Sequence, residues 1–270
     1  MNKLAIGVDL GGTNLRIAAV DEQGTLVEKV TLGTKVSLGR DHVIGDMCDA
    51  IQLLSDKYRN SAPLLGIGVG GGLVQGGQIW RGANGMAGEF GHTTVEPDGH
   101  PCGCGNRGCL VQYAWASAVV RMAREAIASD GAPALARAAQ SDPEFSAKSI
   151  YNLAIQGDED ARRIFRYVGR CLGIVLSAMV NSLNLPIYVI GGGVASAWEA
   201  FSPAIFAELR ARSMVYAATA PPDASASHEG ASEHVKAGPG HKTIITRALL
   251  GSDAGLYGAA RLPMIAEARS

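Results

Sequence analysis

The sequence predicts an α/β protein built from two related domains, and three observations support this. Two short apolar runs, residues 4–10 and 15–20, flank a glycine-rich turn and are typical of a β-hairpin. The pattern returns at residues 64–80, where a strand predicted at 64–74, with three consecutive glycines, turns back into Ile79-Trp80. Between the two hairpins, residues 41–58 carry apolar side chains three or four apart, which indicates an amphipathic helix. Two such hairpins suggest two domains that face each other across a cleft.

Composition narrows the class of protein. The 270 residues are 47% hydrophobic and 18% charged, which is typical of a globular chain with a substantial core. The net charge of −1 argues against sequence-independent nucleic-acid binding as the main activity. We expect no signal peptide, no membrane-spanning run and a cytoplasmic location, in which the cysteines stay reduced.

Three of the five cysteines, Cys102, Cys104 and Cys109, fall within eight residues, and His92 and His100 precede them. Thiolates and imidazoles at such spacing suit a tetrahedral structural zinc ion. A disulfide is the alternative, but a Cys-Gly-Cys pair is too close for ordinary disulfide geometry. Spacing alone leaves the fourth ligand open between the two histidines. Cys48 and Cys171 lie in helical patterns and are expected to be buried thiols.

The same stretch resembles a known family. G-E-F-G-H followed by C-x-C-G-x-x-G-C is similar to the signature of the ROK family of sugar kinases and sugar-responsive repressors. The resemblance implies the actin-like ATPase or hexokinase fold, which is a duplicated RNase H-like domain. It also implies that His92 completes the zinc site with Cys102, Cys104 and Cys109, and that Glu89 holds sugar hydroxyls. Asn84 of the R-G-A-N-G element joins the sugar site by the same resemblance.

The first hairpin suggests a phosphate site. The backbone amides of Gly11 and Gly12 and the Thr13 hydroxyl suit a phosphate-binding turn, and Asp9 would orient a magnesium-bound nucleotide phosphate. No Walker loop is present, because no glycine loop opens a helix with a Lys-Ser/Thr pair. By resemblance this is the family's first phosphate loop.

Two further glycine clusters resemble nucleotide-binding elements of the family. Gly70 and Gly71 belong to the second hairpin. Gly191, Gly192 and Gly193 follow the apolar strand 187–190 and resemble the adenosine-binding element, although a tight strand-to-helix turn would need the same residues.

The rest of the chain predicts a helical region and a loop. Gly157 ends one helix and Asp158 caps the next, which carries a core stripe to about residue 183. Ser202-Pro203 predicts a helix start. The remaining expectations are helices at 110–128 and 147–156, a loop with a short helix at 130–143, a mobile surface loop at 218–241, a strand at 243–246 and a closing helix at 248–260.

One part of the family pattern is missing. A sugar kinase needs a carboxylate to take the proton of the attacking hydroxyl, and the family places it in an Asn-Asp pair between the first helix and the second hairpin. No Asp or Glu occurs from residue 58 to 88. The first domain, residues 1–64, is also short beside an ordinary domain of about 100–150 residues, and residues 65–270 form the second. Ile67 and Val111 replace the expected threonine and the second sugar-binding carboxylate.

The leading prediction is therefore an ATP-dependent, glucokinase-like hexose kinase that forms a 6-phosphate with Mg²⁺ and carries structural Zn²⁺. The alternative is a catalytically impaired relic that binds sugar or nucleotide. Eight residues precede Asp9, so we do not expect the DNA-binding domain of the family's repressors. A zinc-stapled structural module ranks last because it leaves the glycine hairpins unexplained. A homodimer would be ordinary for such an enzyme, but the sequence leaves both the oligomeric state and the identity of the hexose open.

Overall fold

The structure is a computed structural model, and it describes residues 4–10, 14–35, 38–59, 64–68, 71–76, 78–129, 131–221 and 242–267. The chain divides into two compact units. The first holds residues 1–70, 191–193 and 248–270, and the second holds residues 71–190 and 194–247.

The first unit is a mixed β-sheet. β1 (Leu4–Leu10), β2 (Asn14–Asp21) and β3 (Leu26–Gly33) form an antiparallel meander, and β4 (Leu64–Gly68) pairs parallel with β1. The strand order is β3-β2-β1-β4, which leaves β4 at one edge among the described strands.

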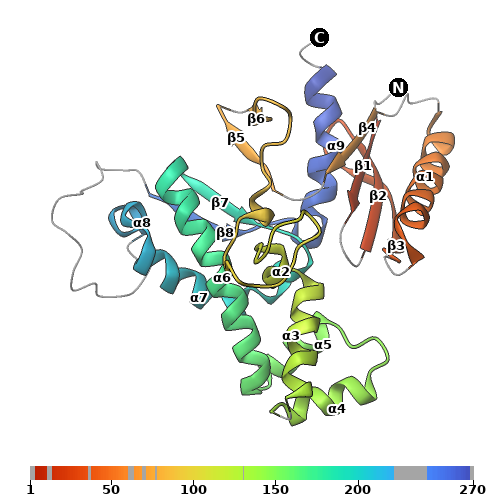
Figure 1. The fold of residues 1–270 in the computed structure, drawn as a ribbon. Helices are drawn as coiled ribbons and strands as arrows, with labels where there is room; N and C mark the ends of the chain where they lie inside the picture. The colour runs from red at the N-terminus through yellow and green to blue at the C-terminus, as the bar shows by residue number, and fades with distance from the viewer. Residues whose placement is uncertain are drawn as a thin grey trace. The chain divides into compact units, whose positions relative to one another are not determined.

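Two helices cover the faces of this sheet, α1 (Arg40–Lys57) on one side and α9 (Ala254–Glu267) on the other (Figure 1). The pleat explains this division, because successive side chains of a strand point to opposite faces. Ile6 and Val8 of β1 pack with Leu54 of α1. Ala5 and its neighbours on the other face pack with Leu256 of α9.

The second unit is mostly helical. It begins with the antiparallel hairpin β5 (Leu73–Gln75) and β6 (Gln78–Trp80). It ends with the parallel pair β7 (Ile187–Ile190) and β8 (Ile244–Arg247). The helices between and beside them are α2 (Val111–Ala114), α3 (Ala116–Ala128), α4 (Pro133–Ser141), α5 (Ala147–Ile155), α6 (Glu159–Leu183), α7 (Trp198–Arg212) and α8 (Met214–Thr219). Short 3₁₀ turns lie at Phe90–His92, Gly193–Ala197 and Gly251–Asp253.

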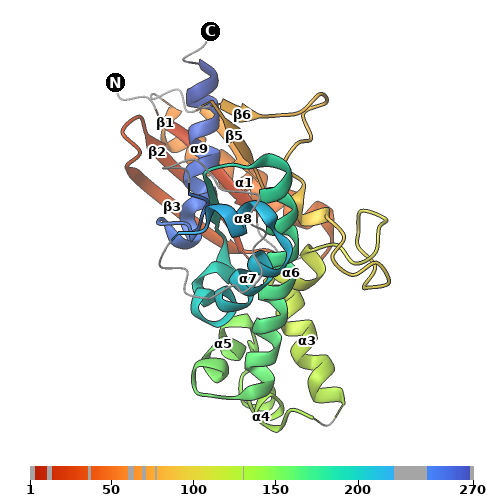
Figure 2. The ribbon, with the colours of Figure 1, turned by 90° about the vertical axis from the view of Figure 1, so that its left-hand side faces the viewer.

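The long helix α6 is the core of this unit, and α7 lies beside it in both views (Figures 1 and 2). Phe165, Val168 and Val175 of α6 are buried in one cluster with Phe201 and Ile205 of α7. By length and composition α6 is apolar enough to cross a membrane. The sequence analysis predicted no membrane-spanning run. However, 56% of its apolar window is buried inside the structure, as in a core helix.

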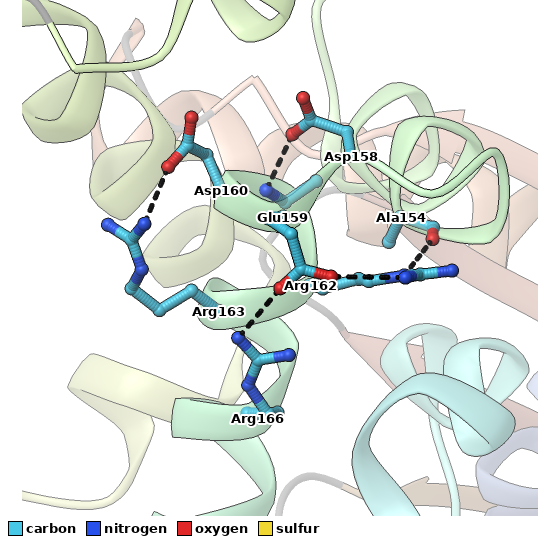
Figure 3. Close-up of polar contacts among 8 residues, drawn as sticks. Ala154, Asp158, Glu159, Asp160, Arg162, Arg163 and Arg166 are labelled. Carbon is cyan, nitrogen blue, oxygen red and sulfur yellow. Dashed lines mark hydrogen bonds and ion pairs between the residues drawn. The ribbon is translucent and has the colours of Figure 1, made fainter.

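The start of α6 confirms the sequence prediction (Figure 3). Asp158 accepts a hydrogen bond from the Ala161 backbone N–H at 2.8 Å, and Gly157 before it has φ +102°. Glu159 contacts Arg162 at 3.0 Å and Arg166 at 3.2 Å. Acidic side chains in the first turn stabilise a helix start, and the Glu159–Arg162 pair three residues apart adds to this.

The expected strand at 64–74 is wrong in one respect, because the structure holds two strands there. β4 pairs with β1 in the first unit, while β5 pairs with β6 in the second. The first boundary between the two units lies between residues 70 and 71, whereas we expected it between residues 64 and 65. Gly251–Asp253 and α9 return to the first unit, since α9 packs on β1 and β4.

Four smaller expectations also need correction. The helix at 110–128 breaks at Trp115, whose extended backbone (ψ 160°) separates α2 from α3. α7 begins at Trp198 and holds Pro203 inside it, so Ser202 is not its cap. The loop expected at 218–241 begins later, because residues 218 and 219 are the end of α8. Residues 222–241, which include His228, His234 and His241, lie outside the described residues. Cys48 is exposed on α1, whereas Cys171 is buried as expected.

Candidate active-site residues and metal centre

The predicted zinc ligands converge in the second unit. One ligand atom from each of His92, Cys102, Cys104 and Cys109 lies within 4.8 Å of all the others. Cys102 Sγ is 3.5 Å from His92 Nδ1, and Cys104 Sγ is 3.7 Å from Cys109 Sγ. A tetrahedral zinc ion with Zn–S of about 2.3 Å and Zn–N of about 2.0–2.1 Å separates its ligands by about 3.8 Å (S to S) and about 3.5 Å (S to N). The residues therefore fit a Cys₃His zinc site, with His92 as the fourth ligand.

Backbone pairing shapes the loop that carries the three cysteines. The Val95 N–H donates to Gly108 O at 2.8 Å, and the Cys102 N–H donates to Asn106 O at 2.8 Å. Gly108 has φ +67°, and a Cβ on it would lie 1.5 Å from Glu96 O. No residue with a side chain fits this backbone, which folds the loop tightly enough to bring the sulfurs together.

The thiols differ in their surroundings. The backbone N–H of Cys104 faces Cys102 and lowers the pKa of that thiol to about 6. Burial raises the pKa of the Cys109 thiol to about 11, and Asn106 Nδ2 approaches its sulfur at 3.5 Å. Metal binding requires the thiolate forms, and the polar loop already favours that form at Cys102.

His92 connects this cluster to the predicted sugar carboxylate. Its Nδ1 faces Cys102, and its Nε2 lies 3.8 Å from Oε2 of Glu89. The 3₁₀ turn Phe90–His92 sets this spacing, because it places residues three apart on one side. Glu89 is exposed and so is open to a ligand. Asn84 is also exposed, and its side-chain oxygen accepts from the Met86 N–H at 3.4 Å.

His100 does not belong to the group of converging metal-ligand side chains and contacts other residues. The His100 N–H donates to Tyr113 Oη at 3.0 Å, and its ring contacts Arg121 of α3 and lies 3.6 Å from Glu125. The ring thus ties the loop to α3, away from the four ligands.

Val111 packs where the family pattern would place a carboxylate. It is 9% exposed and forms a small apolar cluster with Cys102 and Cys109. A Cβ on Gly91 would lie 2.7 Å from Val111 Cγ1, so this side chain fills the space beside the 3₁₀ turn. Val111 therefore belongs to the packing of the metal loop and offers no polar group to a sugar.

Of the predicted second phosphate loop, only Gly71 lies within the described residues. A Cβ on Gly71 would lie 2.6 Å from Gly88 O, and one on Gly88 would lie 2.5 Å from Gly71 O. These two glycines let the second hairpin pack against the segment that leads to Glu89. Gly11, Gly12, Thr13 and Gly70 lie outside the described residues.

Asp9 lies in a charged cluster of the first unit. Its register partner on β2, Arg16, approaches it at 3.5 Å, and Lys29 of β3 contacts Asp253 at 2.8 Å. Burial raises the pKa of Asp9, Arg16 lowers it, and the negative charge of Asp253 raises it further. Sequence reasoning missed Arg16, Lys29 and Asp253 because nothing in local spacing pairs β2 and β3 with the start of α9.

The predicted adenosine element also belongs to the first unit. Gly192 has φ +85°, a conformation that L side chains rarely adopt. A Cβ on Gly193 would meet nothing within 4 Å, and one on Gly191 would reach Ala248 at an ordinary 3.6 Å. The space beside Gly193 is open, as close approach of a flat ligand requires.

Known proteins match this chain over most of its length. The sequence profile of the ROK family matches residues 62–264. A glucokinase from Halalkalibacterium halodurans is 40% identical over 136 residues, which cover 50% of this chain and 41% of that protein. A glucokinase from Thermotoga maritima is 28% identical, over 72% of this chain and 83% of that protein. A solved ROK glucokinase from Streptomyces griseus, in complex with glucose and AMPPNP, has a TM-score of 0.70 at 22% identity and covers 97% of this chain and 99% of that one.

The Thermotoga maritima match extends over 263 aligned positions but uses 72% of this 270-residue chain, about 194 residues. About 69 aligned positions (263 − 194) thus have no counterpart in this chain.

Proposed function

The chain belongs to the ROK family, and from this premise we propose that it is an ATP-dependent hexose kinase that forms a sugar 6-phosphate. Glu89 and Asn84 hold the sugar, Asp9 orients the magnesium-bound nucleotide, and Gly191–Gly193 accept the adenosine. The fold is that of ROK glucokinases, the actin-like ATPase and hexokinase fold.

The observation that carries this proposal is the position of His92 between the metal cluster and Glu89. One ring nitrogen lies 3.5 Å from Cys102 Sγ and the other 3.8 Å from Glu89. A carboxylate at the second ring nitrogen orients a metal-ligating histidine, so Glu89 suits the metal site as well. Because Glu89 is also exposed, its oxygens are open to sugar hydroxyl groups, from which carboxylates accept strong hydrogen bonds.

The two metals have different tasks. Zinc held by His92 and the three cysteines stabilises the loop and fixes the orientation of the His92 ring. Mg²⁺ arrives with ATP and neutralises charge on the β- and γ-phosphates. Most of the catalytic effect of phosphoryl transfer comes from such positioning and charge stabilisation.

A second candidate function is favoured by one specific observation. Residues 58–88 contain no Asp or Glu, so the carboxylate that would take the proton of the sugar hydroxyl is absent from the stretch in which the family carries it. A chain with this composition would bind sugar and nucleotide but transfer phosphate slowly or not at all.

Intact mass measured beside a coupled ADP-release assay with a panel of hexoses separates the two candidates. A mass of 28.0 kDa with hexose-dependent ADP release at ordinary kinase rates establishes the kinase and removes the missing-base argument. The same mass with hexose and nucleotide binding but no turnover establishes the binding protein. A mass several kilodaltons higher shows that the natural chain holds a further segment, and turnover is then expected.

A further inference from the structure

The start of α9 contacts the candidate nucleotide-binding carboxylate, Asp9. α9 lies directly on β1, because a Cβ on Gly7 would be 2.5 Å from Leu256 O and 2.7 Å from the Ala260 backbone N. Asp9 follows Gly7 by two residues on β1, so both point to the face that α9 covers. The helix therefore approaches the strand closely at the point where Asp9 emerges.

The carboxylate of Asp9 lies against the first turn of this helix. A Cβ on Gly255 would lie 3.0 Å from Asp9 Cγ, 3.0 Å from Oδ1 and 3.1 Å from Oδ2. All three distances are tighter than most real Cβ contacts, so a side chain at residue 255 would require the carboxylate to move by a few tenths of an ångström. The first turn of a helix also favours an adjacent negative charge, since its backbone N–H groups point outward.

Two ion pairs fix the surroundings of this contact. Asp253, directly before α9, contacts Lys29 of β3 at 2.8 Å, which fastens the helix start to the sheet. Arg16 on β2, the register partner of Asp9, approaches its carboxylate at 3.5 Å. The Asp9 side chain is 21% exposed, and it lies close to both Arg16 and Gly255.

We infer that Gly255 is a positioning residue for Asp9, whose carboxylate reaches its working orientation only because residue 255 has no side chain. This inference rests on the proposed role of Asp9 in binding a magnesium nucleotide. It assigns to the closing helix a part in nucleotide binding through Asp9, without a contact of its own to the ligand.

The matched control lies on the same helix. A Cβ on Gly258 meets nothing within 4 Å, so Gly258→Ala makes the same chemical change in α9 without touching Asp9. Asp9→Ala removes the carboxylate with which a side chain at residue 255 would collide.

The test measures dissociation constants by calorimetry for magnesium AMPPNP and for glucose, on the full chain and four variants: G255A, G258A, D9A and D9A/G255A. We expect G255A to raise the Kd of the nucleotide about tenfold, by analogy with other small misplacements of binding groups, while the Kd of glucose is unchanged. G258A should match the wild type. In the D9A background G255A should have no further effect, because the group that it displaces is gone.

The outcomes distinguish the inference from the proposed function. Normal nucleotide affinity in G255A, or a G255A effect that adds fully to that of D9A, overturns the inference and leaves the proposed function standing. A wild-type chain that binds no nucleotide, or a D9A variant that binds like the wild type, overturns the assigned role of Asp9 and the inference with it. Should G255A alone fail to fold, the double variant is expected to fold. If the double variant also fails to fold, residue 255 acts on packing and the inference is wrong.

Discussion

The Nε2 atom of His92 lies 3.8 Å from Oε2 of Glu89, while Nδ1 of the same ring faces the thiol of Cys102. A ring held at one nitrogen by a metal offers a fixed partner at the other. The candidate metal ligands and the proposed sugar carboxylate thus share the His92 ring, and we expect loss of zinc to alter the position of Glu89.

Removing the metal should weaken sugar binding. Cys104→Ser deletes one of four ligands, so we expect zinc to be lost and the Kd of the hexose to rise at least about tenfold, the lower end of the effect seen when support of a metal site is removed. Zinc content is measured by atomic absorption, and the hexose Kd by calorimetry.

Cys48→Ser is the control, because Cys48 is an exposed thiol on α1 in the other unit. It should keep both zinc and hexose affinity. If a zinc-free Cys104→Ser chain bound hexose as tightly as the wild type, the proposed link through His92 would be wrong.

Gly108 should be the least replaceable glycine of the metal loop. Gly108→Ala combines φ +67° with a Cβ placed 1.5 Å from Glu96 O. The left-handed backbone alone costs about 1–2 kcal/mol, and the collision adds to this. We expect the free energy of unfolding of this unit to fall by more than about 2 kcal/mol, measured by urea denaturation.

Gly103→Ala in the same loop is the comparison, because a Cβ there meets nothing within 4 Å. We expect it to change the free energy of unfolding by less than about 0.5 kcal/mol. Equal effects of the two substitutions would show that the loop rearranges freely around residue 108.

The convergence of the four candidate metal ligands was predictable from the sequence because these residues are close together in the chain. The three cysteines share a short glycine-rich loop, and a single 3₁₀ turn joins Glu89 to His92. The caps of α6 were predictable for the same reason, since Asp158 bonds a backbone group only three residues away.

Features that depend on distant partners were not predictable. Residues 64–74 carry one unbroken apolar pattern, and its division depends on β1 and β6, which take its two ends into different sheets. The exposure of Cys48 depends on which face of α1 meets the sheet. The role of Gly255 depends on Asp9, which lies 246 positions earlier in the sequence.

Glu96 should anchor the metal loop to α6. Its Oε1 accepts hydrogen bonds from Tyr167 Oη at 2.9 Å and from Arg170 Nη1 at 3.0 Å. Both contacts are partly exposed, so we expect Glu96→Ala to lower the free energy of unfolding by about 1–2 kcal/mol. Thermal unfolding monitored by circular dichroism is the measurement.

Asp98→Ala tests whether any lost carboxylate in this loop has the same effect. Asp98 is exposed two residues further on, and its removal should change the free energy of unfolding by less than about 0.5 kcal/mol. A Glu96→Ala variant as stable as Asp98→Ala would mean that the loop does not depend on α6 for its docking.

Asp9 should reduce the stability of the protein at neutral pH. Burial is the largest cause that raises the pKa of its carboxyl above 3.8 in the folded state. The folded chain then holds the Asp9 proton more tightly than the unfolded chain, so stability falls as pH rises from the unfolded value through the folded one. Each unit by which the pKa is raised corresponds to about 1.4 kcal/mol lost above that window.

Asp9→Asn removes the charge and with it this loss. We expect the variant to have the higher free energy of unfolding at pH 7, and its advantage over the wild type to shrink as pH falls through the folded pKa of Asp9 and to vanish near 3.8. Urea denaturation of both chains across this pH range is the measurement.

An advantage that stays constant with pH would assign the effect to packing around Arg16. A variant less stable than the wild type at pH 7 would show that the Arg16 ion pair outweighs the cost of burying Asp9. A higher free energy of unfolding in Asp9→Asn would mean that the Asp9 carboxylate lowers the stability of the wild type. Such a cost is expected of a group that is retained for ligand binding.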